Sequence, residues 1–290
     1  MDCVSIAAPD FDLAMTLDSG QTFLWEPHGA GFIGTIGDLP AYLEQRGDDM
    51  LVTHEAAAAV PHYFALDHPL GEICRSFPAD AAMDAARDYC RGLRIMRQPI
   101  WECLASFITS SMKQVAHIRQ MSRALREQFG QELTLYGSHV YAYPAADRLA
   151  EASEVELRGC GLGYRAKNLL LTAGRVASGD APLESWRALP DDELRAHLCS
   201  LPGVGVKVAN CVMLFAYERL RAFPIDVWIE RVLKEKYFPR ARKLTPERLR
   251  KFCDSYFGAH GGYAQQYLFH HARKTTPRRR KHLARERHLL

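Results

Sequence analysis

A turn with two glycines, Leu201-Pro202-Gly203-Val204-Gly205, separates two helical stretches and constrains the fold more than any other feature of the chain. The periodicity predicts a helix over 191–200, capped by Asp191, and a second helix over 206–218. Glycine lets backbone N–H groups approach an anion, and the N-terminus of the second helix adds the positive end of its dipole. Such a helix-hairpin-helix grips a phosphate without reading base sequence. A plain helix–helix corner would give the same pattern.

Lys207 falls in the first turn of the second predicted helix. The positive end of the helix dipole disfavours an ammonium group there, and burial would act in the same direction. A lysine with a lowered pKa is a neutral amine and a nucleophile toward a carbonyl-like carbon. The alternative is a solvated lysine on the surface, the commonest position of any single lysine.

Asp226 stands nineteen residues further on, in Pro224-Ile225-Asp226-Val227-Trp228, just before another apolar-periodic stretch. We predict that it caps a helix starting near residue 227. The helix end would keep the carboxylate ionised and place it to stabilise positive charge developing on a sugar ring. The capping role and the catalytic role are compatible.

The chain changes character near residue 97. Before it, short apolar pieces at 23–25, 32–36 and 50–53 alternate with turn residues, which predicts antiparallel strands, and 80–92 resembles a helix. After it, helical spacing dominates, with helices expected around 98–108, 118–125, 165–178, 246–257 and beyond 262. We expect an α+β protein: an N-terminal antiparallel sheet domain with helices (1–97), a mostly helical core of two subdomains around a cleft (98–272) and a basic tail (273–290).

Charge is divided unevenly between these parts. Residues 1–97 contain six Arg and no Lys against fifteen Asp and Glu, whereas the rest contains 31 basic against 19 acidic side chains. The basic excess of the second part indicates an anionic partner, although two solvated surfaces of opposite sign would give the same counts. The tail would add phosphate contacts or be a solvated terminus.

Cysteine spacing and hydropathy exclude several classes. The eight cysteines include no CxxC pair, no zinc-type Cys/His spacing and no four-cysteine run for an iron–sulfur cluster. The start, Met1-Asp2-Cys3-Val4, lacks the pattern of a signal peptide, and no apolar run approaches a membrane span. We therefore expect an intracellular protein with reduced thiols and no membrane partner.

Two segments, LPGVGVKVANC (201–211) and PIDVWIERVL (224–233), together resemble the signature of the helix-hairpin-helix (HhH-GPD) DNA glycosylase superfamily. In that superfamily, a lysine at the position of Lys207 marks the bifunctional branch. Four more segments resemble the 8-oxoguanine DNA glycosylase/AP lyase family, in family order: the N-terminal motif at 19–25, the start of the catalytic core at 102–108, the duplex-probing loop at 161–166 and the last base-pocket helix at 264–269.

The resemblance implies a base-excision repair enzyme that flips 8-oxoguanine out of duplex DNA. Lys207 would form a Schiff base, Asp226 would stabilise the cationic sugar, and β-elimination would then cut the abasic strand. The Gly20 carbonyl would accept the N7–H that guanine lacks. Cys211 and Phe269 would sandwich the base and Gln265 would bond its Watson–Crick edge. Without the family, core or surface roles would be preferred for these last three side chains.

The resemblance also implies DNA contacts outside the pocket. Tyr164 would wedge into the duplex with Arg165 as its support. The backbone carbonyls of Cys199, Leu201 and Val204 would hold a structural monovalent or divalent cation. No redox cofactor or iron–sulfur cluster is implied, and a monomer on double-stranded DNA is expected, in the nucleoid of a bacterium or the nucleus of a eukaryote. The full expected DNA-binding set is Tyr164, Arg165, Lys113, His117, Gly203 and Gly205.

The chain departs from the animal members where they grip the orphaned cytosine. Those members have three asparagines after a Ser-Ser pair and an arginine further on, but here Met112-Lys113-Gln114 follows Ser110-Ser111 and His117 takes the arginine position. Trp228 replaces a phosphate-contacting histidine. We predict weaker discrimination of the base opposite the lesion.

Three other functions fit parts of this pattern. A glycosylase for another damaged base is disfavoured by Gly20, Gln265 and Phe269. A non-catalytic helix-hairpin-helix DNA-binding module would leave the pair of Lys207 and Asp226 unexplained. A structural or scaffolding protein would leave the basic second part unexplained.

Overall fold

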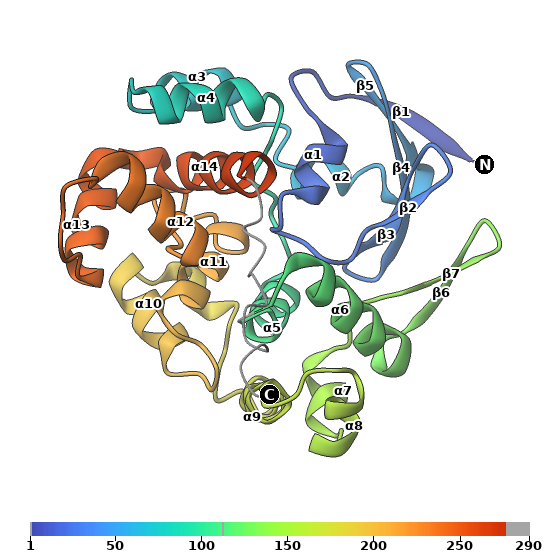
Figure 1. Ribbon diagram of the computed structural model, residues 1–290. Helices are drawn as coiled ribbons and strands as arrows, with labels where there is room; N and C mark the ends of the chain where they lie inside the picture. The colour runs from blue at the N-terminus through green and yellow to red at the C-terminus, as the bar shows by residue number, and fades with distance from the viewer. Residues whose placement is uncertain (1, 112, 277–290) are drawn as a thin grey trace, which may run out of the picture.

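The computed structural model describes residues 2–111 and 113–276, and these residues form an α+β protein (Figure 1). Met112 and residues 277–290, which include most of the predicted tail, lie outside the described residues. An antiparallel sheet with short helices forms the N-terminal part, and helices dominate the second part, as the sequence predicts. Within the described residues, no helix combines the length and apolar character needed to span a membrane.

The N-terminal sheet has five strands in the order β1-β5-β4-β3-β2, every neighbouring pair antiparallel. Leu43 and Val52 face each other in the middle of the sheet and are fully buried. Three consecutive residues of β4, Ala41 to Leu43, are buried, so both faces of the sheet are covered there. Leu43 belongs to the main core, whereas Tyr42 lies in a smaller apolar cluster with Ile33, Leu135 and Val140. The strands are β1 (Cys3–Ala7), β2 (Glu26–His28), β3 (Gly31–Ile36), β4 (Leu39–Arg46) and β5 (Asp49–Thr53).

One predicted strand is wrong. Residues 23–25 are extended but pair with no strand, and β2 begins only at Glu26. The Trp25 ring covers Gly34 of β3, where an added Cβ would lie 2.7 Å from the ring. Large apolar side chains therefore pack into the core here rather than alternate along a ladder. A second hairpin, β6 (Glu132–Leu135) and β7 (Ser138–Tyr141), was not predicted; its turn places Tyr136 and Gly137 at positive φ.

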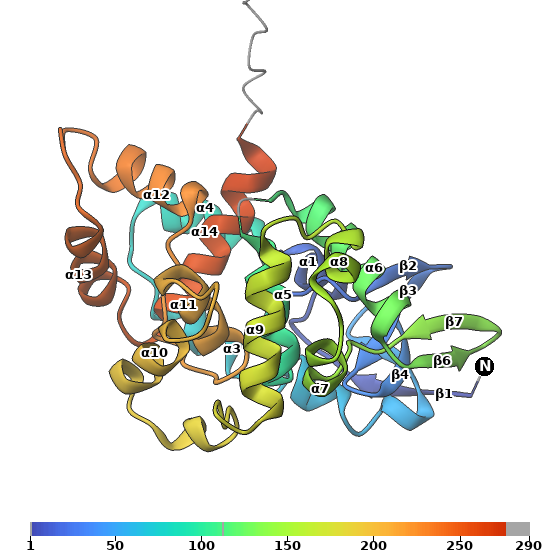
Figure 2. The ribbon, with the colours of Figure 1, turned by 90° about the horizontal axis from the view of Figure 1, so that it is seen from below.

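The helices of the second part surround α5, which packs against α6, α9 and α11 at the centre of the molecule (Figures 1 and 2). Helix α14 packs against α4 on one side and α12 on the other, and one end of it approaches α1. The helices are α1 (Leu13–Asp18), α2 (Val60–Tyr63), α3 (Leu70–Arg75), α4 (Ala81–Tyr89), α5 (Ile100–Ser110), α6 (Val115–Phe129), α7 (Ala146–Ala150), α8 (Glu154–Gly159), α9 (Arg165–Ala177), α10 (Asp191–Cys199), α11 (Val206–Phe215), α12 (Val227–Val232), α13 (Pro246–Tyr256) and α14 (Gly261–Thr275).

Several predicted helix ends need correction. Pro190 occupies the N-cap position of α10, and Asp191 makes no capping bond but pairs with Arg219 at 3.2 Å. Helix α11 ends at Phe215, because the chain turns so that Glu218, at φ +57°, can pair with Arg97. Helix α14 continues to Thr275, so the first residues of the predicted basic tail are helical.

Candidate active site

A pocket of about 310 Å³, open to solvent, lies where α11, α14 and the loop after α1 meet. Every predicted catalytic and base-binding residue lines it, although these residues come from four separate segments of the chain. The lining residues are Gly20, Phe107, Lys207, Cys211, Phe215, Pro224, Asp226, Gln265, Gln266 and Phe269.

Lys207 reaches the pocket from the first turn of α11. Its Nζ lies 5.1 Å from the centroid of the Phe107 ring, and Phe107 itself stacks on Phe215. The Phe107 ring therefore lies beside the amine on the wall of the pocket. Cys211 follows one turn later on the same face and is buried, which raises the pKa of its thiol. Cys211 therefore presents a neutral thiol to the pocket.

Asp226 caps α12, as predicted, because its carboxylate accepts the backbone N–H of Ile229 at 2.8 Å. Burial raises the pKa of this carboxyl, while the N–H groups of Ile229 and Trp228 and the charge of Lys207 act in the opposite direction. The net pKa is above the ordinary value. The hydrogen bonds at the helix end therefore limit the rise of the Asp226 pKa but do not cancel it.

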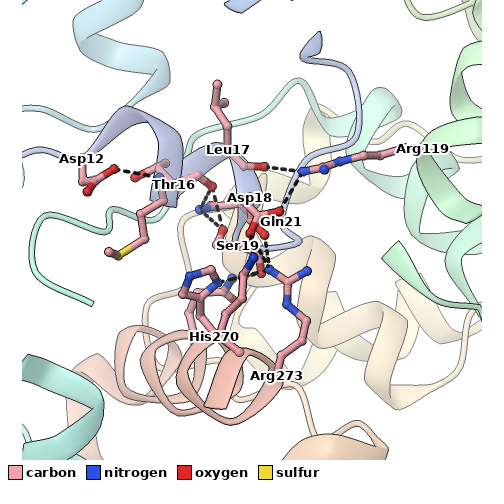
Figure 3. A network of polar contacts seen from close by, with 12 residues as sticks. Asp12, Thr16, Leu17, Asp18, Ser19, Gln21, Arg119, His270 and Arg273 are labelled. Atoms are coloured by element: carbon pink, nitrogen blue, oxygen red, sulfur yellow. Dashed lines mark hydrogen bonds and ion pairs between the residues drawn. The ribbon is translucent and has the colours of Figure 1, made fainter. Parts of the chain in front are cut away.

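Gly20 occupies a position that only glycine fits. Its φ is +89°, and an added Cβ would lie 3.3 Å from Cε1 of Phe269 and 3.6 Å from Cγ2 of Val115. Both neighbours of Gly20 are anchored in the interior. The Ser19 carbonyl accepts the Gln266 amide at 2.9 Å, and the Gln21 amide bonds the Arg94 carbonyl at 2.8 Å (Figure 3 shows Ser19 and Gln21). The Gly20 carbonyl is therefore carried on a rigid segment beside Phe269.

Gln265 faces the pocket from α14 and is buried, which excludes the surface role that its sequence alone allows. Its side-chain oxygen Oε1 has no hydrogen-bond partner among the described residues. A buried amide oxygen without a partner costs free energy unless a ligand or water satisfies it. The pocket thus contains a buried polar group without a partner among the described residues, beside aromatic side chains, which is an arrangement suited to a polar ligand.

The two glycines of the hairpin differ in what they do. Gly203 has φ +81°, and a Cβ there would lie 2.8 Å from Cβ of Asn168 on α9. Gly205 has φ −93° at the N-cap of α11, with nothing within 4 Å of an added Cβ. Gly203 is therefore required by the turn and by the close approach of α9, whereas Gly205 leaves the N-terminus of α11 open.

The hairpin carbonyls fall into two groups. Those of Ser200 and Pro202 accept hydrogen bonds from the side chains of Arg175 and Thr172 on α9, at 2.9 and 3.0 Å. Those expected to hold a cation, on Cys199, Leu201 and Val204, accept none from α9 side chains within the part of the chain that the structure describes, although the Leu201 carbonyl accepts the Val204 N–H at 3.1 Å. These three carbonyls therefore differ from the two that side chains of α9 engage.

The remaining predicted DNA-binding residues lie at or just before the N-termini of α6 and α9. Tyr164 is 58% exposed, and the Arg165 guanidinium lies 4.4 Å from the centroid of its ring. Arg165 itself is buried and donates to the carbonyls of Ser111 and Leu162, so it can support Tyr164 but is not free to contact a phosphate. Lys113 and His117 are exposed, and Met112 between Ser111 and Lys113 is outside the described residues.

Two family models match the chain consecutively. The 8-oxoguanine DNA glycosylase N-terminal domain matches residues 3–104, and the HhH-GPD superfamily base excision DNA repair protein matches residues 105–256. The N-glycosylase/DNA lyase OGG1 of Arabidopsis thaliana is 32% identical over 285 residues, which cover 90% of this chain and 77% of the plant protein. The chain belongs to the 8-oxoguanine DNA glycosylase family.

Solved structures of the family superpose over nearly the whole chain. The 8-oxoguanine glycosylase/lyase of Clostridium acetobutylicum, in complex with double-stranded DNA containing cytosine opposite 8-oxoG, is 32% identical with a TM-score of 0.86, covering 94% of this chain and 99% of that one. MBOgg1 in complex with a low-affinity DNA ligand is 30% identical with a TM-score of 0.89, covering 94% and 96%. A 3-methyladenine DNA glycosylase of Archaeoglobus fulgidus, 18% identical with a TM-score of 0.78, has the same fold.

Four residues of the pocket were not predicted from the sequence: Phe107, Phe215, Pro224 and Gln266. Phe215 carried a signal, because it continues the one-turn spacing of Lys207 and Cys211 along α11. Phe107 lies inside a segment that resembles the family but has no polar group to attract notice. Gln266 acts through its bond to Ser19, a contact 247 residues away in sequence that no local pattern indicates.

Proposed function

We propose that the protein excises 8-oxoguanine from duplex DNA and then cuts the abasic strand, with Lys207 as the nucleophile. The observation that carries this proposal is that Lys207, Asp226, Gly20, Gln265 and Phe269 line one pocket. The family to which the chain belongs, and relatives named N-glycosylase/DNA lyase and 8-oxoguanine glycosylase/lyase, support the same reaction.

The chemistry follows from the groups that face the pocket. The flipped nucleotide would place its base against Phe269 and Cys211, with the N7–H of 8-oxoguanine donating to the Gly20 carbonyl. Gln265 would satisfy its free Oε1 on the Watson–Crick edge of the base. Guanine has no proton on N7, so it would set a lone pair against the Gly20 carbonyl. The Gly20 carbonyl therefore favours 8-oxoguanine over guanine, because N7 is a hydrogen-bond donor in the lesion and an acceptor in guanine.

In the first step, the neutral amine of Lys207 attacks C1′ of the deoxyribose while the bond from C1′ to N9 breaks. The released base takes up a proton, and the amine loses one as the aminal forms. The Asp226 carboxylate stabilises the positive charge that develops on the sugar ring. Ring opening then gives a protonated Schiff base between Lys207 and C1′.

In the second step, the Schiff base makes a proton on C2′ acidic. Its removal breaks the bond from C3′ to oxygen, which releases the 3′-side strand as a 5′-phosphate. Hydrolysis of the imine then returns Lys207 as the free amine. The same lysine thus serves both the glycosylase and the lyase reaction, and no redox cofactor takes part.

The hairpin would bind the DNA backbone near the lesion. Backbone N–H groups at the open N-terminus of α11 are suited to a phosphate. A monovalent or divalent cation on the carbonyls of Cys199, Leu201 and Val204 would supply a positive charge that bridges to the same phosphate. We further propose that the enzyme acts as a monomer and, as a repair enzyme, wherever the cell keeps its DNA, in a bacterial nucleoid or a eukaryotic nucleus.

A panel of duplexes tests the substrate. Single-turnover release of the base should be fast for 8-oxoguanine, and far slower for guanine, hypoxanthine and an alkylated purine in the same sequence. Comparable rates on an alkylated purine would contradict the proposal. Varying the base opposite 8-oxoguanine in this panel tests the prediction from Lys113 and His117: rates should differ little among the four opposite bases, and strict dependence on cytosine would refute it.

A further inference from the structure

The carboxylate of Asp18, the last residue of α1, receives cations from two other helices. Arg119 of α6 approaches it at 3.4 Å, and Arg273 and Lys274 of α14 approach it at 3.3 and 2.5 Å (Figure 3). Backbone groups add to this junction, because Arg119 also donates to the Leu17 carbonyl and Arg273 to the carbonyl of Asp18 itself. Asp18 therefore fastens the end of α1 to α6 and to α14 at once.

The same three segments meet again at Gly20, two residues further along the chain. Gly20 packs between Val115 of α6 and Phe269 of α14. Val115 is one helical turn before Arg119, and Phe269 is one turn before Arg273, so each helix contacts Gly20 and, one turn later, Asp18. The Arg273 guanidinium also lies 5.8 Å from the centroid of the Phe269 ring. The ionic junction is thus stacked directly on the wall of the base pocket.

The junction brings several basic side chains around a single carboxylate, that of Asp18. His270 is buried, which lowers the pKa of its imidazole to about 4, and Arg273 contacts its Nδ1 at 3.2 Å. Three cations therefore share one carboxylate. Burial raises the pKa of Asp18, but Lys274, Arg273 and Arg119 together bring it below its ordinary value, as expected of an ionised group held among cations. Without that charge, the cations would repel one another across the junction.

We propose that Asp18 is a positioning residue for recognition of the damaged base: it holds α6 and α14 against the segment that carries Gly20. Ser19 and Gln21 are fixed by buried hydrogen bonds, including the bond from Gln266 of α14 to the Ser19 carbonyl, and the Asp18 junction joins both α6 and α14 to the same segment. Asp18 would not touch the base. It would act through the distance between the Gly20 carbonyl and the stacking face of Phe269.

The proposal rests on the proposed function, and comparing excision, which needs base recognition, with abasic-site cleavage, which does not, distinguishes it from a general loss of structure. Asp18→Asn removes the charge at constant size. It should slow single-turnover excision of 8-oxoguanine by about ten- to hundredfold, as expected for a displacement on the order of 1 Å at a recognition group. Cleavage of a duplex with a preformed abasic site needs no base recognition and should change by less than about threefold. Asp18→Glu, which restores the charge, should recover most of the excision rate.

Glu26→Gln is the matched control, because Glu26 also joins the N-terminal part to α6, through Arg126 at 3.1 Å and Arg123 at 3.5 Å, but lies away from the pocket. It should leave both rates unchanged. If Asp18→Asn lowers the folded fraction, Arg119→Gln, whose side chain is partly exposed, should show a smaller loss in the same direction. Provided that the wild type excises 8-oxoguanine, two results for Asp18→Asn would overturn the role of Asp18: equal losses of excision and abasic-site cleavage, or no loss of either. Absence of excision by the wild type would instead overturn the proposed function and this role with it.

Discussion

Replacing Gly203 by alanine should destabilise the protein, whereas the same change at Gly205 should not. At Gly203 the backbone has φ +81°, and the new Cβ would lie 2.8 Å from Cβ of Asn168 and 3.1 Å from its Nδ2. Non-bonded carbons normally approach only to about 3.5–4.0 Å. Cβ of Asn168 is fixed to the backbone of α9, so the clash cannot be relieved by a rotation of the Asn168 side chain.

The magnitude follows from two costs and one gain. Left-handed backbone costs about 1–2 kcal/mol for a residue with a Cβ, and overpacking of a fixed contact costs about 1–3 kcal/mol. Loss of freedom in the unfolded chain returns about 0.4–1 kcal/mol. The expected loss is therefore about 1–5 kcal/mol, which for a chain of this size lowers the melting temperature by about 2–8 °C.

Thermal and urea unfolding of Gly203→Ala and Gly205→Ala, measured beside the wild type, test this reasoning. Gly205→Ala adds a methyl group in open space at φ −93°, so its free energy of unfolding should stay within about 1 kcal/mol of the wild type. Affinity for an undamaged duplex should fall with Gly203→Ala, because the hairpin N–H groups lose their arrangement. Equal stability of the two variants would refute the assignment of strain to Gly203.

Three further predictions concern the wedge, the carboxylate in the pocket and a buried glutamate. Tyr164→Ala should slow excision about tenfold or more, since base–aromatic stacking contributes about 1–3 kcal/mol, while the stability of the free protein stays within about 0.5 kcal/mol because the ring is exposed. Burial raises the pKa of Asp226 above 3.8, and a protonated carboxyl cannot stabilise the cationic sugar. The excision rate should therefore decline as the pH falls through that pKa. A pH–rate profile still flat at and below pH 3.8 would contradict this. Burial raises the pKa of Glu102 to about 8, so the folded state keeps a proton on Glu102 that the unfolded state releases above pH 4.5. The free energy of unfolding should therefore decrease from about pH 4.5 to 8. Glu102→Gln should flatten that decrease in unfolding measurements, and an unchanged slope would exclude Glu102 as its cause.

The helical core was predictable because its signals are local. Helix periodicity, the two-glycine turn and the residues just before α12 each lie within a few positions of one another, so the hairpin, Lys207 and the capping role of Asp226 follow from the sequence. The base-binding residues Gly20, Gln265 and Phe269 followed only from resemblance to a family. Taken alone, none of them differs from an ordinary loop, surface or core residue.

The features that could not be predicted depend on contacts between distant segments. The strand predicted at 23–25 does not form, because the Trp25 ring packs over Gly34. Helix α11 ends before the predicted residue, because Glu218 pairs with Arg97. The junction at Asp18 joins residues more than 100 positions apart, so no window of sequence contains it. Burial was the other missing quantity, since it raises the pKa of Asp226 against the effect of the helix end.

Borohydride trapping shows whether Lys207 forms a covalent intermediate with the DNA. The protein would be mixed with a labelled duplex that carries 8-oxoguanine opposite cytosine, reduced with borohydride and separated on a denaturing gel beside Lys207→Gln. Our account predicts a covalent protein–DNA adduct from the wild type and none from the variant, because reduction fixes the Schiff base on Lys207. An adduct of equal yield from Lys207→Gln, or release of the base by the wild type without any adduct, would contradict it.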